Sequence, residues 1–87
     1  MIYTHTTVAS SSNVERMIRQ SSALSDVQQQ LNEAYLAAVA KIDKNEIMKL
    51  KSDHATWLKQ RDLCKDHDCI HTSLMKRLTK LDRLNKP

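Results

Sequence analysis

"LSDVQQQLNEAYLAAVAKI", residues 24–42, carries the strongest helix pattern in this chain of 87 residues. Its apolar positions recur in steps of three and four over about five turns, the spacing of one buried face of an α-helix. These positions are Leu24, Val27, Leu31, Ala34 with Tyr35, Ala38 and Ile42. The chain has no glycine, and its single proline is Pro87, so nothing interrupts a helix in the interior. We therefore predict an all-α fold.

Each predicted helix follows a Ser or Asp, whose side-chain oxygen accepts a hydrogen bond from an unpaired backbone N–H at the helix start. The spacing of Ser12 and Glu15 is that of a capping box, in which the two residues cap each other's backbone. In chain order we expect a short helix over residues 13–20, a long helix after Ser21 or Ser22, a third from Asp43 to near Cys64, and a last one from Asp66 or Asp68 to about Asn85.

The domain organisation follows from these boundaries. Residues 1–11 are rich in Thr and Ser without a sustained period, so we expect a flexible N-terminal arm followed by one helical domain over residues 12–86. Short connections favour antiparallel packing of three to four helices in a small bundle or hairpin. The remaining apolar surface of the last helix would also suit a homodimer, and the pattern does not decide between the two arrangements.

The sequence leaves the compartment open. No stretch approaches the roughly 18 consecutive apolar residues of a membrane span, so we predict no transmembrane segment. The N-terminal stretch "MIYTHTTVASSSN" lacks the basic start and the apolar block of a signal peptide. Either the protein is intracellular, or this is a mature form without its leader.

The formal net charge of +4 is concentrated at the C-terminal end. Residues 1–73 hold equal numbers of basic and acidic side chains, whereas the last helix is basic. Four of its cations, which we place on its polar side, are candidate partner-binding residues: Lys76, Arg77, Lys80 and Arg83. Nucleic acid or an acidic protein would suit such a surface, although a solvated face that favours the helix dipole is the simpler interpretation.

"RDLCKDHDC", residues 61–69, contains both cysteines of the chain, Cys64 and Cys69, with His67 between them and His71 beyond. A zinc site usually presents its ligand pairs as separate arms, and these four residues interleave, so we expect no metal. The C-x4-C spacing also differs from the C-x-x-C of redox catalysts. A helix end and a helix start on either side would allow a disulfide. Spacing alone does not distinguish that bridge from two free thiols.

No pattern indicates catalysis. We find no triad context, no carboxylate pair that must share a site and no glycine-rich phosphate loop, so we expect no catalytic residue and no cofactor. His54 lies on the apolar stripe between Leu50 and Trp57, which predicts a buried, hydrogen-bonded histidine rather than a ligand.

Several segments together resemble a known family. "NVERMIRQSSALSDVQQQL" at residues 13–31, "LNEAY" at 31–35, "ATWLKQRDLC" at 55–64 and "CIHTSLMKRLTKL" at 69–81 are similar, in order and spacing, to the motifs of the LprI-like lysozyme inhibitor family. The resemblance spans about residues 14–84. It implies an exported, periplasmic helical protein of the bacterial envelope, a disulfide between Cys64 and Cys69, and four scaffold signature residues, which are Leu31, Tyr35, Trp57 and Arg61. Arg61 lies one turn after Trp57, where a guanidinium can stack on the indole.

The chain departs from the family pattern at the N-terminal end. The family usually has a further cysteine pair in this segment. In this chain the first of these cysteines would fall near Thr7, and Arg19 stands where the second would be. The two cysteines are missing together, as expected when one disulfide is lost as a unit. We therefore expect the first helix to be less firmly attached than in relatives.

The resemblance implies a non-enzymatic binding or inhibitor module that docks on a protein partner, such as a lysozyme. Lysozymes are typically basic, so an inhibitor that relies on overall charge complementarity would show an acidic face, and this chain is basic. The alternative is an intracellular interaction protein on the same scaffold, with free thiols and a basic last helix that contacts nucleic acid or an acidic protein.

Overall fold

The structure, a computed structural model, describes residues 12–86. Within that range the chain forms four helices and no strand. The helices are α2 (Asn13–Gln20), α3 (Ser22–Lys41), α4 (Lys44–Arg61) and α5 (His67–Asn85). The predicted all-α fold is confirmed. The predicted arm, residues 1–11, lies outside the described residues.

Polar caps set the helix starts, as the sequence predicts. The Ser12 hydroxyl accepts from the backbone N–H of Glu15 at 3.1 Å, and the Glu15 carboxylate accepts from the backbone N–H of Ser12, which completes the capping box. The other three N-caps are Ser21, Asp43 and Asp66. The third helix ends at Arg61, slightly before the predicted position near Cys64, because residues 62–66 turn back toward α5.

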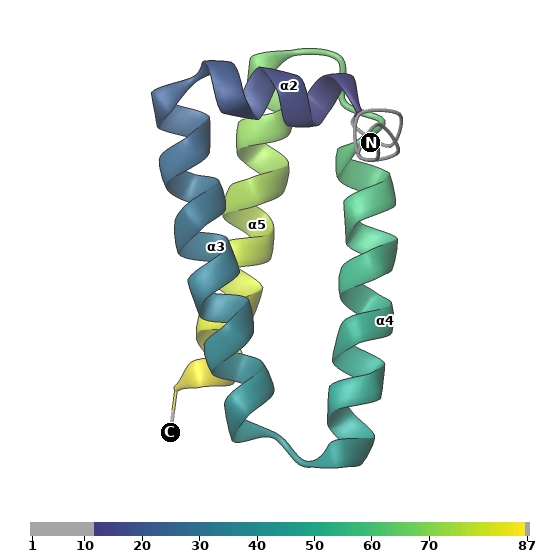
Figure 1. Cartoon of the computed structure of the whole chain (residues 1–87). Helices are drawn as coiled ribbons and strands as arrows, with labels where there is room; N and C mark the ends of the chain where they lie inside the picture. The colour runs from purple at the N-terminus through teal and green to yellow at the C-terminus, as the bar shows by residue number, and fades with distance from the viewer. Residues whose placement is uncertain (1–11, 87) are drawn as a thin grey trace, which may run out of the picture.

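Three long helices stand side by side, and α2 lies across one end of them (Figure 1). The chain runs down α3, up α4 and down α5, so helices that are consecutive in sequence are antiparallel, as expected. The closest pair is not consecutive, however. The parallel helices α3 and α5 approach each other more closely along their length than either approaches α4.

Small residues allow the close approach of α3 and α5. Ala34 and Ala38 lie one turn apart on the same face of α3, and Ala38 is fully buried. The Asn85 amide donates to the Ala34 carbonyl at 3.0 Å, which places this face against α5. The largest fully buried side chains of the pair fill the core around the alanines: Leu24, Leu31, Ile70, Leu74 and Leu81. Each such side chain contributes about 1.5–3 kcal/mol through its removal from water.

Helix α4 contributes fewer and larger side chains to the core. Its buried residues are Leu50, Trp57 and Arg61. Besides Leu50, an aromatic ring and guanidinium groups fill much of the space between α4 and the other two long helices. This difference makes the α4 contact polar and specific.

Helix α2 is held by burial and hydrogen bonds. Val14 and Ile18 are buried, and the Ser25 hydroxyl of α3 donates to the Ile18 carbonyl at 2.6 Å. The Ser12 hydroxyl donates to the Asp62 carboxylate at 3.3 Å, which links the start of α2 to the end of α4. Arg19, at the position of the family's N-terminal cysteine, is exposed at the end of α2.

The two cysteines lie at the junction of α4 and α5. Their Cα atoms are 5.5 Å apart and their Sγ atoms are at bonding distance, 2.06 Å. Cys69 lies in the first turn of α5, where its backbone N–H donates to the capping Asp66 carboxylate at 2.8 Å. The backbone N–H of Cys64 donates to the Arg61 carbonyl, which closes the turn after α4. Backbone geometry thus brings the cysteines together as a bridge requires.

The α3–α5 contact should not tolerate a larger residue at position 38. We expect Ala38→Leu to lower the free energy of unfolding by about 1–3 kcal/mol, since added methylenes in a filled core force side chains or backbone to move. Chemical denaturation followed by circular dichroism measures this. Ala37→Leu, at the exposed neighbouring position, is the control and should change stability by less than about 0.5 kcal/mol. Equal effects from both variants would contradict close packing at Ala38.

We expect Cys64 and Cys69 to be oxidised in the isolated protein. A thiol reagent should then find no reactive thiol in the denatured protein until a reductant is added. The double variant Cys64→Ser/Cys69→Ser should lose about 2 kcal/mol of stability, the loop-entropy value for so short a loop. Reduction should destabilise the wild type by a similar amount and leave the double variant unchanged. Two free thiols in the natively isolated protein would contradict this expectation.

Candidate functional site

Trp57 of α4 is the centre of the polar contact between the helices. Guanidinium carbons lie near its ring from two helices, that of Arg61 at 5.7 Å and that of Arg77 at 5.9 Å from the ring centroid. The indole N–H donates to the Ser73 hydroxyl of α5 at 3.1 Å. The Trp57 residue is 9% exposed. The expected contact between Arg61 and Trp57 is present, and Arg77 adds a second cation at the same ring.

His54 extends this cluster toward α3. Its imidazole stacks on the Tyr35 ring with centroids 4.1 Å apart, and it lies 5.2 Å from the Trp57 ring. The Arg77 Nε–H donates to His54 Nδ1 at 3.3 Å. Burial lowers the pKa of His54 below its ordinary value, and the charges of Arg77 and Arg61 lower it further. His54 is therefore a neutral acceptor at neutral pH. The predicted hydrogen bond is present, although the side chain is half-buried rather than buried.

Arg61 is fully supplied with acceptors. Its Nε and Nη2 both donate to the Asp62 carboxylate, at 3.1 and 2.8 Å, and its Nη1 donates to the Gln28 amide of α3 at 2.9 Å. The Glu15 carboxylate of α2 lies 3.9 Å from Nη2. Arg61 thus joins α4 to α2 and α3, and at 4% exposure it is part of the scaffold.

Arg77 is buried, which corrects the expectation that it lies on the polar side of the last helix. Arg77 is 5% exposed. Burial lowers the pKa of its guanidinium, and the negative charge of Asp53 partly offsets this by raising it. In the part of the chain that the structure describes, no carboxylate lies within ion-pair distance of it, and its Nη2 has no hydrogen-bond partner. The sequence held a signal for this burial, because position 77 continues the spacing of the buried residues Ile70, Leu74 and Leu81.

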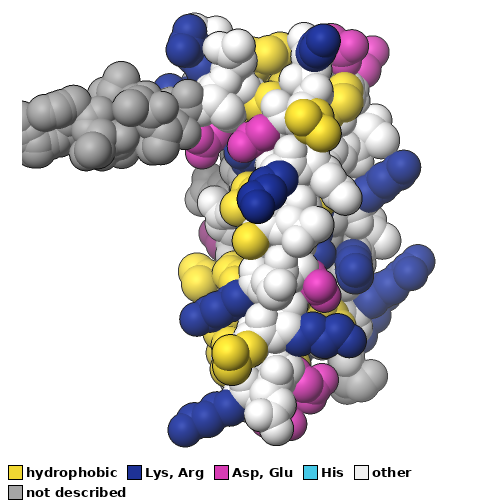
Figure 2. All heavy atoms as spheres, turned by 90° about the vertical axis from the view of Figure 1, so that its right-hand side faces the viewer, with side chains coloured by type: hydrophobic (Ala, Val, Ile, Leu, Met, Phe, Trp, Pro, Cys, Tyr) yellow, Lys and Arg dark blue, Asp and Glu magenta, His cyan; other side chains and the backbone are white. Residues whose placement is uncertain are grey.

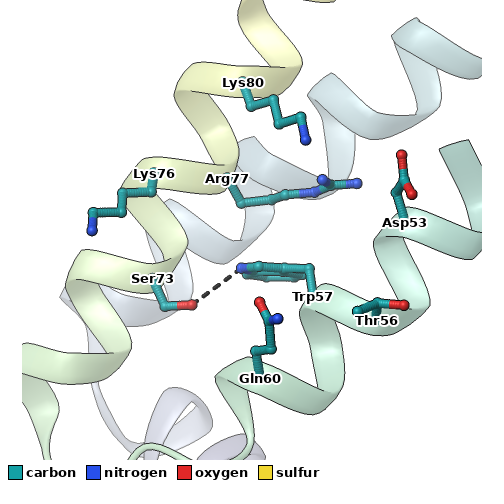
Figure 3. A pocket seen from close by; sticks show the side chains of 8 residues that line it. All are labelled: Asp53, Thr56, Trp57, Gln60, Ser73, Lys76, Arg77 and Lys80. Carbon is teal, nitrogen blue, oxygen red and sulfur yellow. Dashed lines mark hydrogen bonds between the residues drawn. The ribbon is translucent and has the colours of Figure 1, made fainter.

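Side chains of α4 and α5 line an open groove above Trp57, which we call the α4–α5 groove (Figure 3). Its volume is about 450 Å³. Three cations and one carboxylate line it together with neutral polar groups: Asp53, Thr56, Trp57, Gln60, Ser73, Lys76, Arg77 and Lys80. Figure 3 shows the Lys80 side chain reaching toward the Arg77 guanidinium and Lys76 projecting outward from the rim.

The other residues singled out in the sequence are spread over the bundle. Leu31 is a core residue and does not reach the groove, while Tyr35 meets the cluster through His54. Arg83 is exposed near the end of α5 and does not line the groove. The structure therefore brings together Tyr35, Trp57, Arg61 and Arg77 inside, and Lys76 and Lys80 at the surface.

Two further findings concern the described residues alone. Residues 12–86 contain no group of three or more His, Cys, Asp or Glu side chains arranged to hold a metal ion. Over the same range no helix is both long and apolar enough to cross a membrane. The histidines of the junction, His67 and His71, are exposed, with ring centroids 6.4 Å apart.

The comparison with protein families identifies the scaffold. The family described as Lysozyme inhibitor LprI matches residues 6–83, nearly the whole chain. The chain belongs to the LprI lysozyme inhibitor family. No curated protein and no solved structure shows a match to it. As an LprI family member it has a lysozyme-inhibitor-like scaffold, and the matched range includes every buried core residue described above.

Within this LprI-family chain the residues of the Trp57 cluster serve mainly the architecture. Arg61 joins α4 to α2 and α3, and Trp57 joins α4 to α5. Both are buried, and Tyr35 is partly buried. The exposed surface of α4 instead carries several Lys side chains and fewer acidic ones, and Figure 2 shows basic side chains spread over this face of the molecule. A binding partner would meet this charged surface and the α4–α5 groove.

Acid should destabilise the protein through His54. The pKa of His54 in the folded protein is below its ordinary value of 6.5, so the unfolded chain takes up the proton first as the pH falls. Stability is therefore full above pH about 6.5 and falls progressively below it. The thermal midpoint of His54→Gln should fall less between pH about 7.5 and about 5.5 than that of the wild type.

The control for this measurement is His71→Gln, which changes an exposed histidine. It should keep the pH dependence of the wild type. A wild-type slope in His54→Gln would show that His54 is not the group responsible.

Proposed function

We propose that this protein is a non-enzymatic inhibitor of lysozyme that acts in the bacterial envelope by docking its helical surface on the enzyme. The observation that carries the proposal is the match of residues 6–83 to the lysozyme inhibitor LprI family. The match covers the caps, the core and the Trp57 cluster, so the chain keeps the scaffold on which the family is defined. The architecture supports docking, because its helices are capped and its interior is cross-linked by hydrogen bonds.

The basic surface is compatible with a basic target. Overall like charge slows the encounter of two proteins, but affinity depends on the local groups that meet. Glycoside hydrolases use a pair of Asp or Glu residues in the substrate cleft, so the region that an inhibitor must block is acidic even in a basic enzyme. Lys76 and Lys80 project from α5 where they can meet such carboxylates.

An envelope location agrees with the cysteine geometry. Disulfides persist in oxidising compartments such as the bacterial periplasm and are rare in the cytosol. The junction of α4 and α5 places Cys64 and Cys69 where a bridge forms without movement of the backbone. We propose export on this ground together with the family assignment.

The test of inhibition needs two substrates. Purified protein in excess should slow the clearing of a bacterial cell-wall suspension by lysozyme. It should also slow the hydrolysis of a soluble, uncharged chito-oligosaccharide. The second substrate is essential because a protein with a net charge of +4 binds anionic cell walls and can shield them without touching the enzyme.

A small basic protein of similar size and no relation to the family serves as the control. It should leave oligosaccharide hydrolysis unchanged. Protection of cell walls alone, with full hydrolysis of the soluble substrate, would contradict direct inhibition.

A further inference from the structure

The α4–α5 groove has an excess of positive charge that the protein itself does not neutralise. Lys76, Arg77 and Lys80 line it, and Asp53 is the single carboxylate among its lining residues. Asp53 acts on Arg77 through its charge but does not come within ion-pair distance. The groove therefore attracts an anionic group.

The two buried arginines differ in how they are satisfied. Arg61 has the Asp62 carboxylate and the Gln28 amide as hydrogen-bond acceptors, and Glu15 nearby. Arg77 has the neutral His54 ring as its hydrogen-bond acceptor, and its Nη2 lacks any partner in the described part of the chain. A buried guanidinium without a carboxylate is costly, and its planar fork matches a carboxylate best. Arg77 thus has an unsatisfied hydrogen-bond donor and an unpaired charge, and a carboxylate ligand would satisfy both.

The surroundings of Arg77 restrict the ligand to a small anionic group. Figure 3 shows the Arg77 side chain lying over the Trp57 ring, with Gln60 on the other side, so the ring face is not free to stack a sugar. Ser73, Thr56 and Gln60 line the groove as neutral polar groups, and Lys80 reaches inward over it. A volume of about 450 Å³ accommodates an acidic side chain together with its neighbours on a protein surface.

Another hollow of the bundle does not share these properties. It lies between α2, α3 and α4, has a volume of about 300 Å³, and contains Glu15, Arg19 and Arg61 among its lining residues. Arg61 there already has its carboxylate and amide acceptors. An incoming anion would compete with these groups, so the α4–α5 groove is the better site.

We propose that the α4–α5 groove is the lysozyme-binding site of this protein and that it receives a side-chain carboxylate of the enzyme between Arg77 and Lys80, with Lys76 at the rim. This inference rests on the proposed function, which supplies the partner. Charge complementarity selects the carboxylate, and the catalytic pair of a glycoside hydrolase provides such groups where an inhibitor must bind.

The first experiment tests the groove without lysozyme. Trp57 is the single tryptophan of the chain, so its fluorescence reports the groove directly. Titration with an oligoglutamate peptide should change the emission saturably, and the change should weaken with added salt. An oligolysine peptide should have no effect. Absence of a saturable change with oligoglutamate would overturn the carboxylate site.

Matched variants separate the groove from general charge. Lys76→Glu/Lys80→Glu changes two groove residues, and Lys51→Glu/Lys59→Glu changes two exposed lysines of α4 outside the groove. Both pairs take the formal net charge from +4 to zero. We expect the groove pair to weaken lysozyme binding by about tenfold or more and the control pair by less than about threefold. Equal losses would show that only the overall charge matters, which would overturn the proposal.

A further variant tests Arg77 itself. Arg77→Met fills the same space without charge, and circular dichroism verifies that it is folded. It should lose the oligoglutamate response and most of the lysozyme affinity. A folded Arg77→Met protein that binds both as the wild type does would show that Arg77 is purely structural and would overturn its assignment to the site.

The outcomes distinguish this inference from the proposed function. If the wild type inhibits lysozyme and the Lys76→Glu/Lys80→Glu variant inhibits it equally well, the proposed function is supported and the α4–α5 groove is not the binding site. If the wild type binds oligoglutamate but does not bind lysozyme, the proposed function falls and lysozyme is not the occupant. Tighter binding of a short single-stranded DNA than of lysozyme would replace the protein partner by a phosphate backbone and overturn the proposal.

Discussion

The contact between the Trp57 ring and the guanidinium groups beside it fixes the position of α4, and much of the structure depends on it. Helices α3 and α5 meet through alanines and leucines, which need no particular orientation to be favourable. Helix α4 instead reaches them with an indole, an imidazole and the Arg61 guanidinium, and α5 adds the Arg77 guanidinium; each of these groups requires specific partners. The polar cluster therefore determines the relation of α4 to its neighbours.

This arrangement makes one set of residues serve both architecture and surface chemistry. Arg61 is neutralised by groups that its own scaffold supplies, so it contributes to cohesion. Arg77 lies near the same ring with a neutral acceptor, and it lines the groove between α4 and α5. The family assignment concerns the scaffold, whereas the distribution of charge around Arg77 is the property that a partner would recognise.

The sequence predicts the local part of the fold well and the long-range part poorly. Helix starts follow from Ser12, Ser21, Asp43 and Asp66, because a cap needs only a side-chain oxygen and a backbone N–H a few residues away. An apolar stripe shows which face of a helix is buried but not which helix it meets. The apolar pattern therefore does not predict the parallel pairing of α3 with α5, although the small residues Ala34 and Ala38 indicate that another helix approaches α3 closely.

The site was harder to predict because it combines residues of two helices that the sequence treats separately. Charged residues are mostly exposed in folded proteins, and we expect Arg77 on the polar side of the last helix. The spacing of Arg77 from Leu74 and Leu81 instead predicts that it lies on the buried face of α5, and the structure shows Arg77 buried there. The predicted contact between Trp57 and Arg61 is present, because residues one turn apart on a helix are neighbours whatever the tertiary fold.

The close pairing of α3 with α5 also has a kinetic consequence. The Asn85 amide and the Ala34 carbonyl, which it bonds, are separated by 51 positions, and the whole of α4 lies between them. The best-packed contact of the bundle is thus highly non-local, and the chain must close a long loop before this contact contributes anything. Ordering of α4 against α5 across the short turn at residues 62–66 shortens that loop and so lowers the entropy cost of the α3–α5 contact.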